Sequence, residues 1–127
     1  KMLGGGMRQA GLLAAAGIHA LEHHVHRLAD DHALAAELAR QLREVAAGHR
    51  RLAGQATVHE AQTNMVFMDV DAELADAFVA HLKANDVRVT AGTQRSGDRM
   101  VKRIRWVTHL DVGREDVRHA MEIIAKF

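Results

Sequence analysis

The sequence predicts an α+β fold, in which long helices precede a small mixed sheet and its own helices. In the first 47 residues, alanine, leucine and isoleucine recur at three- and four-residue spacing, which is typical of one face of a helix. From residue 64 onward, short β-prone stretches alternate with helical patterns and turns. The chain has 127 residues, the length of one domain, and its aromatic content of 3% favours closely packed helices over a thick aromatic core.

The first part of the chain predicts a helix over residues 7–24 and a second over residues 28–47, as one bent helix or as two. Gly11 and Gly17 lie inside the first pattern. Because a glycine costs about 1 kcal/mol relative to alanine in a helix, we expect close packing there. Gly48 is a stop signal for the second helix.

The rest of the chain predicts strands and helices in alternation, after a loop over residues 48–62 that holds a short strand at 56–59. Asp71 is expected to cap a helix, and Arg105 lies in the middle of a strand whose alternate residues face opposite sides. The expected elements are a strand at 64–70, a helix to residue 84, a strand at 87–90, an exposed hairpin or loop at 94–99, a strand at 100–109 and a helix at 114–127 that buries Val117, Ala120, Met121 and Ile124.

Composition narrows the functional class. The formal net charge of +1 gives no reason to expect a nucleic acid or an anionic membrane as partner. The absence of cysteine excludes a disulfide framework and a thiolate zinc site, and is compatible with a cytoplasmic protein. The most apolar stretch, residues 10–21, is too short to span a bilayer. We therefore expect a soluble, cytoplasmic protein.

The glycine run Gly4, Gly5 and Gly6, followed by Arg8, predicts an anion site. Free amides at the start of the expected helix, its dipole and a guanidinium together suit a phosphate. The alternative is a flexible linker.

Arg105 is a second candidate site residue. An arginine that projects from a sheet suits bidentate recognition of a carboxylate. The alternative is that Arg105 makes a structural ion pair while Asp111 or Gly113 caps the last helix. The neighbouring cations favour a solvated loop and one buried arginine over a nucleic-acid site: Arg95, Arg99, Lys102 and Arg103.

The spacing of three histidines raises the possibility of a metal site. His19, His23 and His26 lie at i, i+4 and i+7, but no carboxylate falls at the spacing of a known metal motif. We therefore expect no metal site.

Four segments resemble the low-specificity L-threonine aldolases, which belong to the β-eliminating lyase group of pyridoxal-phosphate enzymes. They are KMLGGGMRQAG at residues 1–11, RLADDH at 27–32, TNMVF at 63–67 and RWVTHLDV at 105–112. The resemblance implies the aspartate-aminotransferase type of fold (fold type I). The chain would be its C-terminal part: residues 1–47 as glycine loop and connector helices from the large domain, and residues 48–127 as a small βαββα-type domain.

The resemblance also implies roles for particular residues. Arg105 would bind the α-carboxylate of the substrate, and Arg8 and Lys1 would lie near the cofactor, with Arg8 on its phosphate side and reaching a neighbouring subunit. His109 and the glycines Gly4, Gly5 and Gly6 would be supporting residues. The lysine that forms the Schiff base in the family lies upstream, and Lys1 is a separate residue, so the chain has no catalytic residue and we expect it to be inactive alone. Residues 94–102 are longer than the connection expected before Arg105.

By resemblance, the parent enzyme would be a homo-oligomer, a dimer or tetramer. It would use pyridoxal 5'-phosphate to cleave β-hydroxy-α-amino acids of the L-threonine and L-allo-threonine type to glycine and an aldehyde. Two alternatives stay open. One is a non-catalytic association module, in which Gly11 and Gly17 allow close helix packing; the other is a related lyase acting on a different amino acid.

Overall fold

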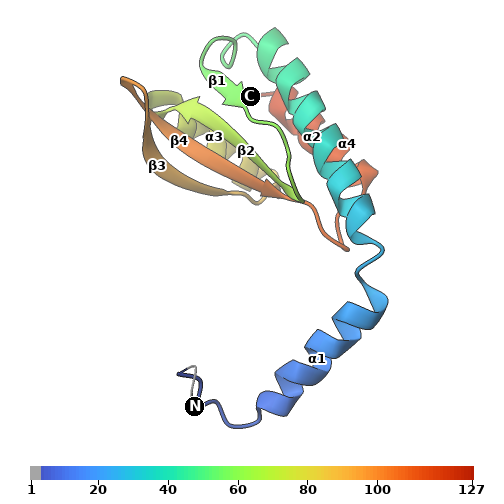
Figure 1. Ribbon diagram of the computed structural model, residues 1–127. Coiled ribbons are helices and arrows are strands. Elements are labelled where there is room, and N and C mark those ends of the chain that lie inside the picture. The colour runs from blue at the N-terminus through green and yellow to red at the C-terminus, as the bar shows by residue number, and fades with distance from the viewer. Residues whose placement is uncertain (1–3) are drawn as a thin grey trace.

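The computed structural model describes residues 4–127 and confirms the α+β class. Within these residues, four helices and four strands follow one another (Figure 1): α1 (Ala10–His23), α2 (Leu28–Gly48), β1 (Ala56–Val58), β2 (Met65–Asp71), α3 (Ala72–Ala84), β3 (Thr90–Ser96), β4 (Arg99–Val107) and α4 (Arg114–Ala125).

The strands form one antiparallel sheet in the order β1-β2-β4-β3. Alternation along β2 and β4 gives the sheet two different faces. Val66, Met68, Ile104 and Trp106 belong to the hydrophobic core together with residues of α2, α3 and α4. The opposite face, which we call the open face, carries Phe67, Asp69, Thr90, Gly92, Gln94, Arg103 and Arg105.

Helix α2 is part of the same core as the sheet. Leu38 and Leu42 on α2 are almost fully buried, and α2 packs along α4 and against β1 and β2 (Figure 1). The apolar residues of α2, which recur at helical spacing, therefore face the sheet, as that spacing predicts. The division at residue 47 into connector and small domain stays a prediction; in this structure the residues on both sides of it share one core.

Helix α1 stands apart from the sheet and from α2 (Figure 1), and none of its residues is buried. A turn over residues 24–27 separates it from α2, so the two patterns form two helices. Apart from the adjoining residues and the backbone of the helix itself, nothing in residues 4–127 lies within 4 Å of the place that a Cβ would take at Gly11 or Gly17. The close packing expected at these glycines is therefore not seen.

The prediction of a strand at residues 87–90 is wrong. Strand β3 begins only at Thr90 and continues to Ser96, where a hairpin connects it to β4, so of the hairpin and the loop expected at residues 94–99 the structure has the hairpin. Val87 and Val89 are partly buried against the core without joining the ladder. The strand was missed because β3 is an edge strand whose residues are nearly all exposed, so it carries no apolar alternation. The hairpin tip lies at Gly97, which has a positive φ of 59°.

The structure corrects the capping expectation for Asp71 and bears out Gly113, one of the two residues expected to cap the last helix. Asp71 occupies the N-cap position of α3, but its side chain makes no capping hydrogen bond; its Oδ1 lies 3.5 Å from Nη2 of Arg99 instead. Gly113, and not Asp111, is the N-cap of α4, and its amide donates to Oδ2 of Asp116 at 2.7 Å. Helix α4 buries Val117, Ala120, Met121 and Ile124 as expected, and Ile123 in addition.

None of the helices in residues 4–127 combines the length and the apolar character that crossing a bilayer would require.

Candidate functional site

The open face of the sheet places Arg103 and Arg105 side by side on β4. The strand register sets Arg105 between Phe67 of β2 and Thr90 of β3, and sets Arg103 between Asp69 and Gly92. A shallow cavity of about 410 Å³, widely open to solvent, lies over this part of the face. We call it the arginine cavity; its walls are formed by Phe67, Thr90, Ala91, Gly92, Thr93, Gln94, Arg103 and Arg105.

Arg103 is held by a buried carboxylate. Its Nε and Nη2 donate to the two carboxylate oxygens of Asp69, each at 2.8 Å, and the Asp69 side chain is only 6% exposed. This bidentate hydrogen bonding lowers the pKa of Asp69, against the opposing effect of burial, and the same bond raises the pKa of Arg103. The positive charge of Arg103 is therefore compensated inside the fold.

His59 and Gln94 complete the surroundings of this ion pair. His59 Nε2 lies 2.9 Å from Oδ2 of Asp69 and 3.2 Å from Nη2 of Arg103. Since one ring nitrogen cannot donate to the first and accept from the second at once, the two contacts belong to different tautomers of the ring. With its amide oxygen turned toward Arg103, Gln94 accepts from Nε and Nη2 at 2.9 Å each.

Arg105 differs from Arg103 in having no hydrogen-bond or ion-pair partner among the described residues 4–127. It is exposed, and within residues 4–127 no carboxylate or carbonyl forms an ion pair or hydrogen bond with its guanidinium. The structural ion pair that was the alternative for Arg105 is therefore made by Arg103, two residues earlier, and the partly buried arginine is also Arg103. Arg105 is left as a guanidinium that can accept an anionic ligand in the arginine cavity.

Directly after Arg105, the chain is fixed by a group of hydrogen bonds that we call the Thr108 network. Thr108 is fully buried, and its Oγ1 donates to the main-chain oxygen of Asp31 at 2.7 Å. Asn64 Nδ2 donates to the Thr108 oxygen at 2.8 Å, and the Thr108 amide donates to the Asn64 oxygen at 2.9 Å. The Asp31 carboxylate is itself paired with Arg27, at 2.9 and 3.2 Å. Three of the four segments that resemble the L-threonine aldolases therefore meet in the Thr108 network, namely residues 27–32, 63–67 and 105–112.

His109 and Asp111 lie beyond the network and are exposed. His109 Nδ1 lies 3.7 Å from Asp111 Oδ2 and accepts from the Asp111 amide at 3.2 Å. These contacts hold the turn before α4 together. The supporting role of His109 stays a prediction.

The glycine run is not brought to the arginine cavity. Gly4, Gly5, Gly6 and Arg8 are exposed, and they lie beyond the end of α1 that points away from the sheet (Figure 1). Helix α1 begins at Ala10, later than expected, after Gln9 in a left-handed conformation with φ 56°, so Arg8 precedes the helix. Lys1 lies outside the described residues. The cofactor roles of Arg8 and Lys1 stay predictions.

The histidines near the end of α1 are partly brought together. The rings of His19 and His23 lie 4.4 Å apart, and those of His19 and His24 lie 5.4 Å apart. His26 falls in the turn after α1 rather than on its face. In residues 4–127, no three metal-ligating side chains come together in a way that could hold an ion.

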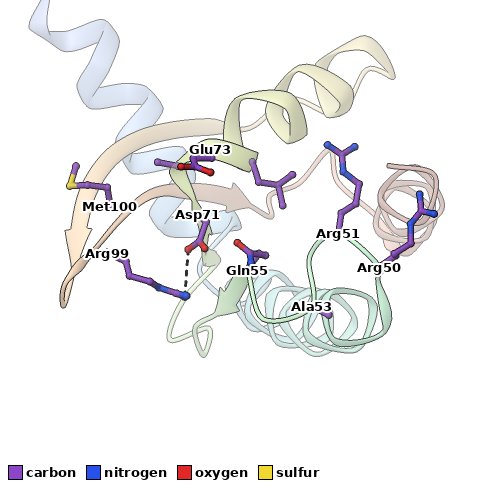
Figure 2. A pocket seen from close by; sticks show the side chains of 10 residues that line it. Arg50, Arg51, Ala53, Gln55, Asp71, Glu73, Arg99 and Met100 are labelled. Carbon is purple, nitrogen blue, oxygen red and sulfur yellow. Dashed lines mark ion pairs between the residues drawn. The ribbon is translucent and has the colours of Figure 1, made fainter.

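A second cavity, of about 830 Å³, lies where β4 begins and α3 starts (Figure 2). Its lining cations are Arg50, Arg51 and Arg99, and its lining carboxylates are Asp71 and Glu73. Arg99 is paired with Asp71, and Arg51 lies 3.8 Å over the Phe127 ring while donating to the Phe127 oxygen at 2.9 Å. Because its walls carry both signs of charge, this cavity is a weaker candidate for an anion than the arginine cavity.

Sequence reasoning missed Asp69, His59 and Gln94 as neighbours of the site. One signal was present: Asp69 is an acidic residue inside the otherwise apolar segment of β2. An acid at such a position needs a buried partner, and an arginine on the adjacent strand was available.

The chain belongs to the β-eliminating lyase family, whose pattern matches residues 1–73. It is 44% identical over 117 residues to the low specificity L-threonine aldolase of Escherichia coli, an alignment that covers 92% of this chain and 30% of the relative. It is 33% identical over 124 residues to low-specificity L-threonine aldolase 1 of Arabidopsis thaliana, with 95% and 31% covered. The chain therefore spans less than a third of the length of these two relatives. These matches confirm the family inferred from the four segments.

Proposed function

We propose that this chain is the C-terminal part of a pyridoxal-phosphate-dependent aldolase that cleaves L-threonine-type β-hydroxy-α-amino acids to glycine and an aldehyde. The observation that carries the proposal is the unpaired guanidinium of Arg105, which lines a cavity whose walls contain no carboxylate. Such a group suits the α-carboxylate that every amino-acid substrate presents. The identity to L-threonine aldolases supports the choice of reaction.

The residues of this chain fit a phosphate and a carboxylate better than they fit covalent attachment of a cofactor. Arg8 is exposed beside three open glycines, an arrangement that leaves backbone and guanidinium donors free for a phosphate. Among the lysines of residues 4–127, Lys102 is paired with Asp76, and Lys83 and Lys126 are exposed and outside the arginine cavity. We therefore propose that the attaching lysine belongs to another part of the parent enzyme and that this chain is inactive alone. When bound, pyridoxal phosphate supplies an electron-accepting ring for the carbanion left by cleavage of the Cα–Cβ bond.

In this proposal the chain contributes binding and orientation. Arg105 holds the substrate carboxylate through two parallel N–H donors and so fixes the direction of the bond to be broken. Arg8, with Lys1 and the glycine run, holds the cofactor phosphate, while His109 supports the turn that follows Arg105. Arg8 directly precedes α1, a helix that stands apart from the sheet (Figure 1), so we propose that it serves the site of a neighbouring subunit in a homo-oligomer.

The exposed apolar residues of α1 support the part of the proposal that concerns assembly. Leu12, Leu13, Ile18 and Leu21 are between 56% and 76% exposed, which is unusual for a helix so rich in apolar residues. We propose that further protein of the parent enzyme covers this helix. The fold type I architecture, the division at residue 47 and a cytoplasmic location are parts of the same proposal.

The test of the carboxylate role uses the complete enzyme that carries this chain. Arg105→Lys keeps the charge and removes the bidentate geometry, so KM for L-threonine should rise about 10- to 100-fold, the equivalent of one charge-assisted hydrogen bond of about 1.5–3 kcal/mol. Arg88→Lys, at an exposed arginine outside the arginine cavity, is the matched control and should leave KM unchanged. An unchanged KM in Arg105→Lys would overturn the assignment.

The test of inactivity uses this chain alone. After mixing with equimolar pyridoxal phosphate and reduction with borohydride, mass spectrometry should find no stoichiometric adduct at any single lysine. One lysine modified to completion would contradict the proposal.

A further inference from the structure

The arginine cavity has two arginines in its wall but only one guanidinium whose charge is free. Arg103 and Arg105 are alternate residues of β4, so their side chains leave the same face of the sheet, with backbone positions about 7 Å apart. Arg103 is bonded to Asp69 through both carboxylate oxygens, whereas Arg105 has no described partner. Two arginines therefore line the cavity, but only the charge of Arg105 is left without a compensating carboxylate among the described residues.

A ligand cannot easily displace Asp69 from its pairing with Arg103. The Asp69 side chain is 6% exposed, so water cannot replace Arg103 as its donor. His59 and Gln94 add further contacts to the guanidinium, at 3.2 and 2.9 Å, which restrict its rotation. A ligand that drew Arg103 away would leave the buried carboxylate of Asp69 without its bidentate partner and with the His59 contact in its place, and that is costly.

We propose that Asp69 is a specificity-determining residue: by holding Arg103, it limits the cavity to substrates with one carboxylate and disfavours β-hydroxy-α-amino dicarboxylic acids. The inference rests on the proposed carboxylate role of Arg105. A dicarboxylic substrate bound through Arg105 places its second carboxylate toward Arg103, whose charge Asp69 has already compensated. That carboxylate meets no uncompensated cation, so the cost of removing it from water is not offset and its binding is disfavoured.

A purely structural role for the pair makes a different prediction. A cross-strand ion pair at Asp69 and Arg103 contributes to holding β2 against β4. If that were its whole role, breaking it would lower stability and affect all substrates alike. The proposal instead requires that the ratio between two substrates changes.

The experiment compares L-threonine with 3-hydroxyaspartate in the complete enzyme. Asp69→Asn removes the charge that compensates Arg103, so kcat/KM for 3-hydroxyaspartate relative to L-threonine should rise about 10-fold or more, the equivalent of one charge-assisted hydrogen bond. In the double variant Asp69→Asn/Arg103→Gln, the freed cation is gone and the ratio should return to within about threefold of the original enzyme. Asp76→Asn removes an exposed carboxylate that pairs with Lys102 outside the cavity, and should leave the ratio unchanged.

A binding measurement on this chain gives a readout apart from activity. Succinate and butyrate share a four-carbon skeleton and differ by one carboxylate. In the original chain, both should shift the NMR signal of the Arg105 Nε–H alone. In Asp69→Asn, succinate should shift the signals of Arg103 and Arg105 together and bind more tightly than butyrate.

The outcomes separate this inference from the proposed function. If Arg105→Lys raises KM but Asp69→Asn leaves the substrate ratio unchanged, the specificity role is wrong and the carboxylate role of Arg105 stands. If Arg105→Lys has no effect on KM, the proposed function fails first. Should Asp69→Asn not fold, Gln94→Arg decides the question. It adds an uncompensated cation to the same cavity and should raise the ratio, and an unchanged ratio overturns the inference.

Discussion

Thr108 Oγ1 donates a hydrogen bond of 2.7 Å to the main-chain oxygen of Asp31, and this bond joins the end of β4 to the first turn of α2. The two residues are 77 positions apart in the sequence. The Asp31 oxygen lies in the first turn of α2, and Thr108 comes three residues after Arg105. The bond therefore sets the position of the strand that carries Arg105 relative to the helix that follows α1.

Loss of the Thr108 hydroxyl should destabilise the fold. Thr108→Val keeps the shape and leaves a buried main-chain oxygen without its side-chain donor, so the free energy of unfolding should fall by about 1–3 kcal/mol. Thr108→Ser keeps the hydroxyl and should lose less, because only a methyl group is removed. Urea unfolding followed by circular dichroism measures both. Equal stability of Thr108→Val and the original chain would show that the bond contributes nothing.

The sequence predicted the elements whose residues have one buried face. Helices α2, α3 and α4 and strands β2 and β4 appear within a few residues of their expected bounds, because burial on one side imposes a period of 3.6 or 2 on their apolar residues. Strand β3 has no such face, since it lies at the edge of the sheet with nearly all residues exposed. Strand β3 is held by backbone pairing with β4. Because backbone pairing imposes no pattern on the side chains, the sequence of this segment does not predict a strand.

The candidate site was predictable only in part for a related reason. Arg105 was singled out from its place in a β-prone stretch, but Arg103 has the same local pattern two residues earlier. The difference between them is decided by β2, where Asp69 faces Arg103 and Phe67 faces Arg105. That register is a property of the assembled sheet. The position of Arg8 relative to the sheet likewise depends on the turn over residues 24–27, which no periodic pattern describes.

Substitutions in α2 and in α1 should have very different effects on the stability of this chain. Leu42 on α2 is 1% exposed within the core, so Leu42→Ala should lower the free energy of unfolding by about 2–5 kcal/mol through lost burial and a cavity. Leu12 on α1 is 76% exposed, and Leu12→Ala should change stability by less than about 0.5 kcal/mol. Urea unfolding of both variants is the measurement. A large loss in Leu12→Ala would show that α1 is packed in solution.

The β3–β4 hairpin offers a matched pair of glycine substitutions. Gly97 has a φ of 59°, which disfavours a Cβ, so Gly97→Ala should destabilise the chain by about 1–2 kcal/mol. Gly92 on β3 has no positive φ and no neighbour within 4 Å of an added Cβ. Gly92→Ala should therefore be neutral or stabilise by up to about 1 kcal/mol, through the unfolded state. Thermal unfolding compares the two, and the reverse order would contradict the turn assigned to Gly97.

The ion pair between Asp69 and Arg103 makes stability depend on pH in one direction. The pKa of Asp69 is lowered in the folded chain, chiefly by its hydrogen bonds to Arg103. A carboxyl whose folded pKa lies below its unfolded value stabilises the fold at pH values above the unfolded pKa, which is about 3.9 for aspartate. The stabilisation is lost as the pH falls through that value toward the folded pKa.

Arg103→Gln should therefore cost stability near neutral pH and much less in acid. At about pH 7 the expected loss is about 1 kcal/mol, a modest figure because the Arg103 side chain is 36% exposed and solvent screens the pair. As the pH falls below the unfolded pKa of aspartate toward the lowered pKa of Asp69, the carboxyl becomes protonated, so the difference from the original chain should shrink. Arg88→Gln, at an exposed arginine, is the control and should show no such trend. Urea unfolding across this range measures the difference, and a loss that grows as the pH falls would refute the assigned pairing.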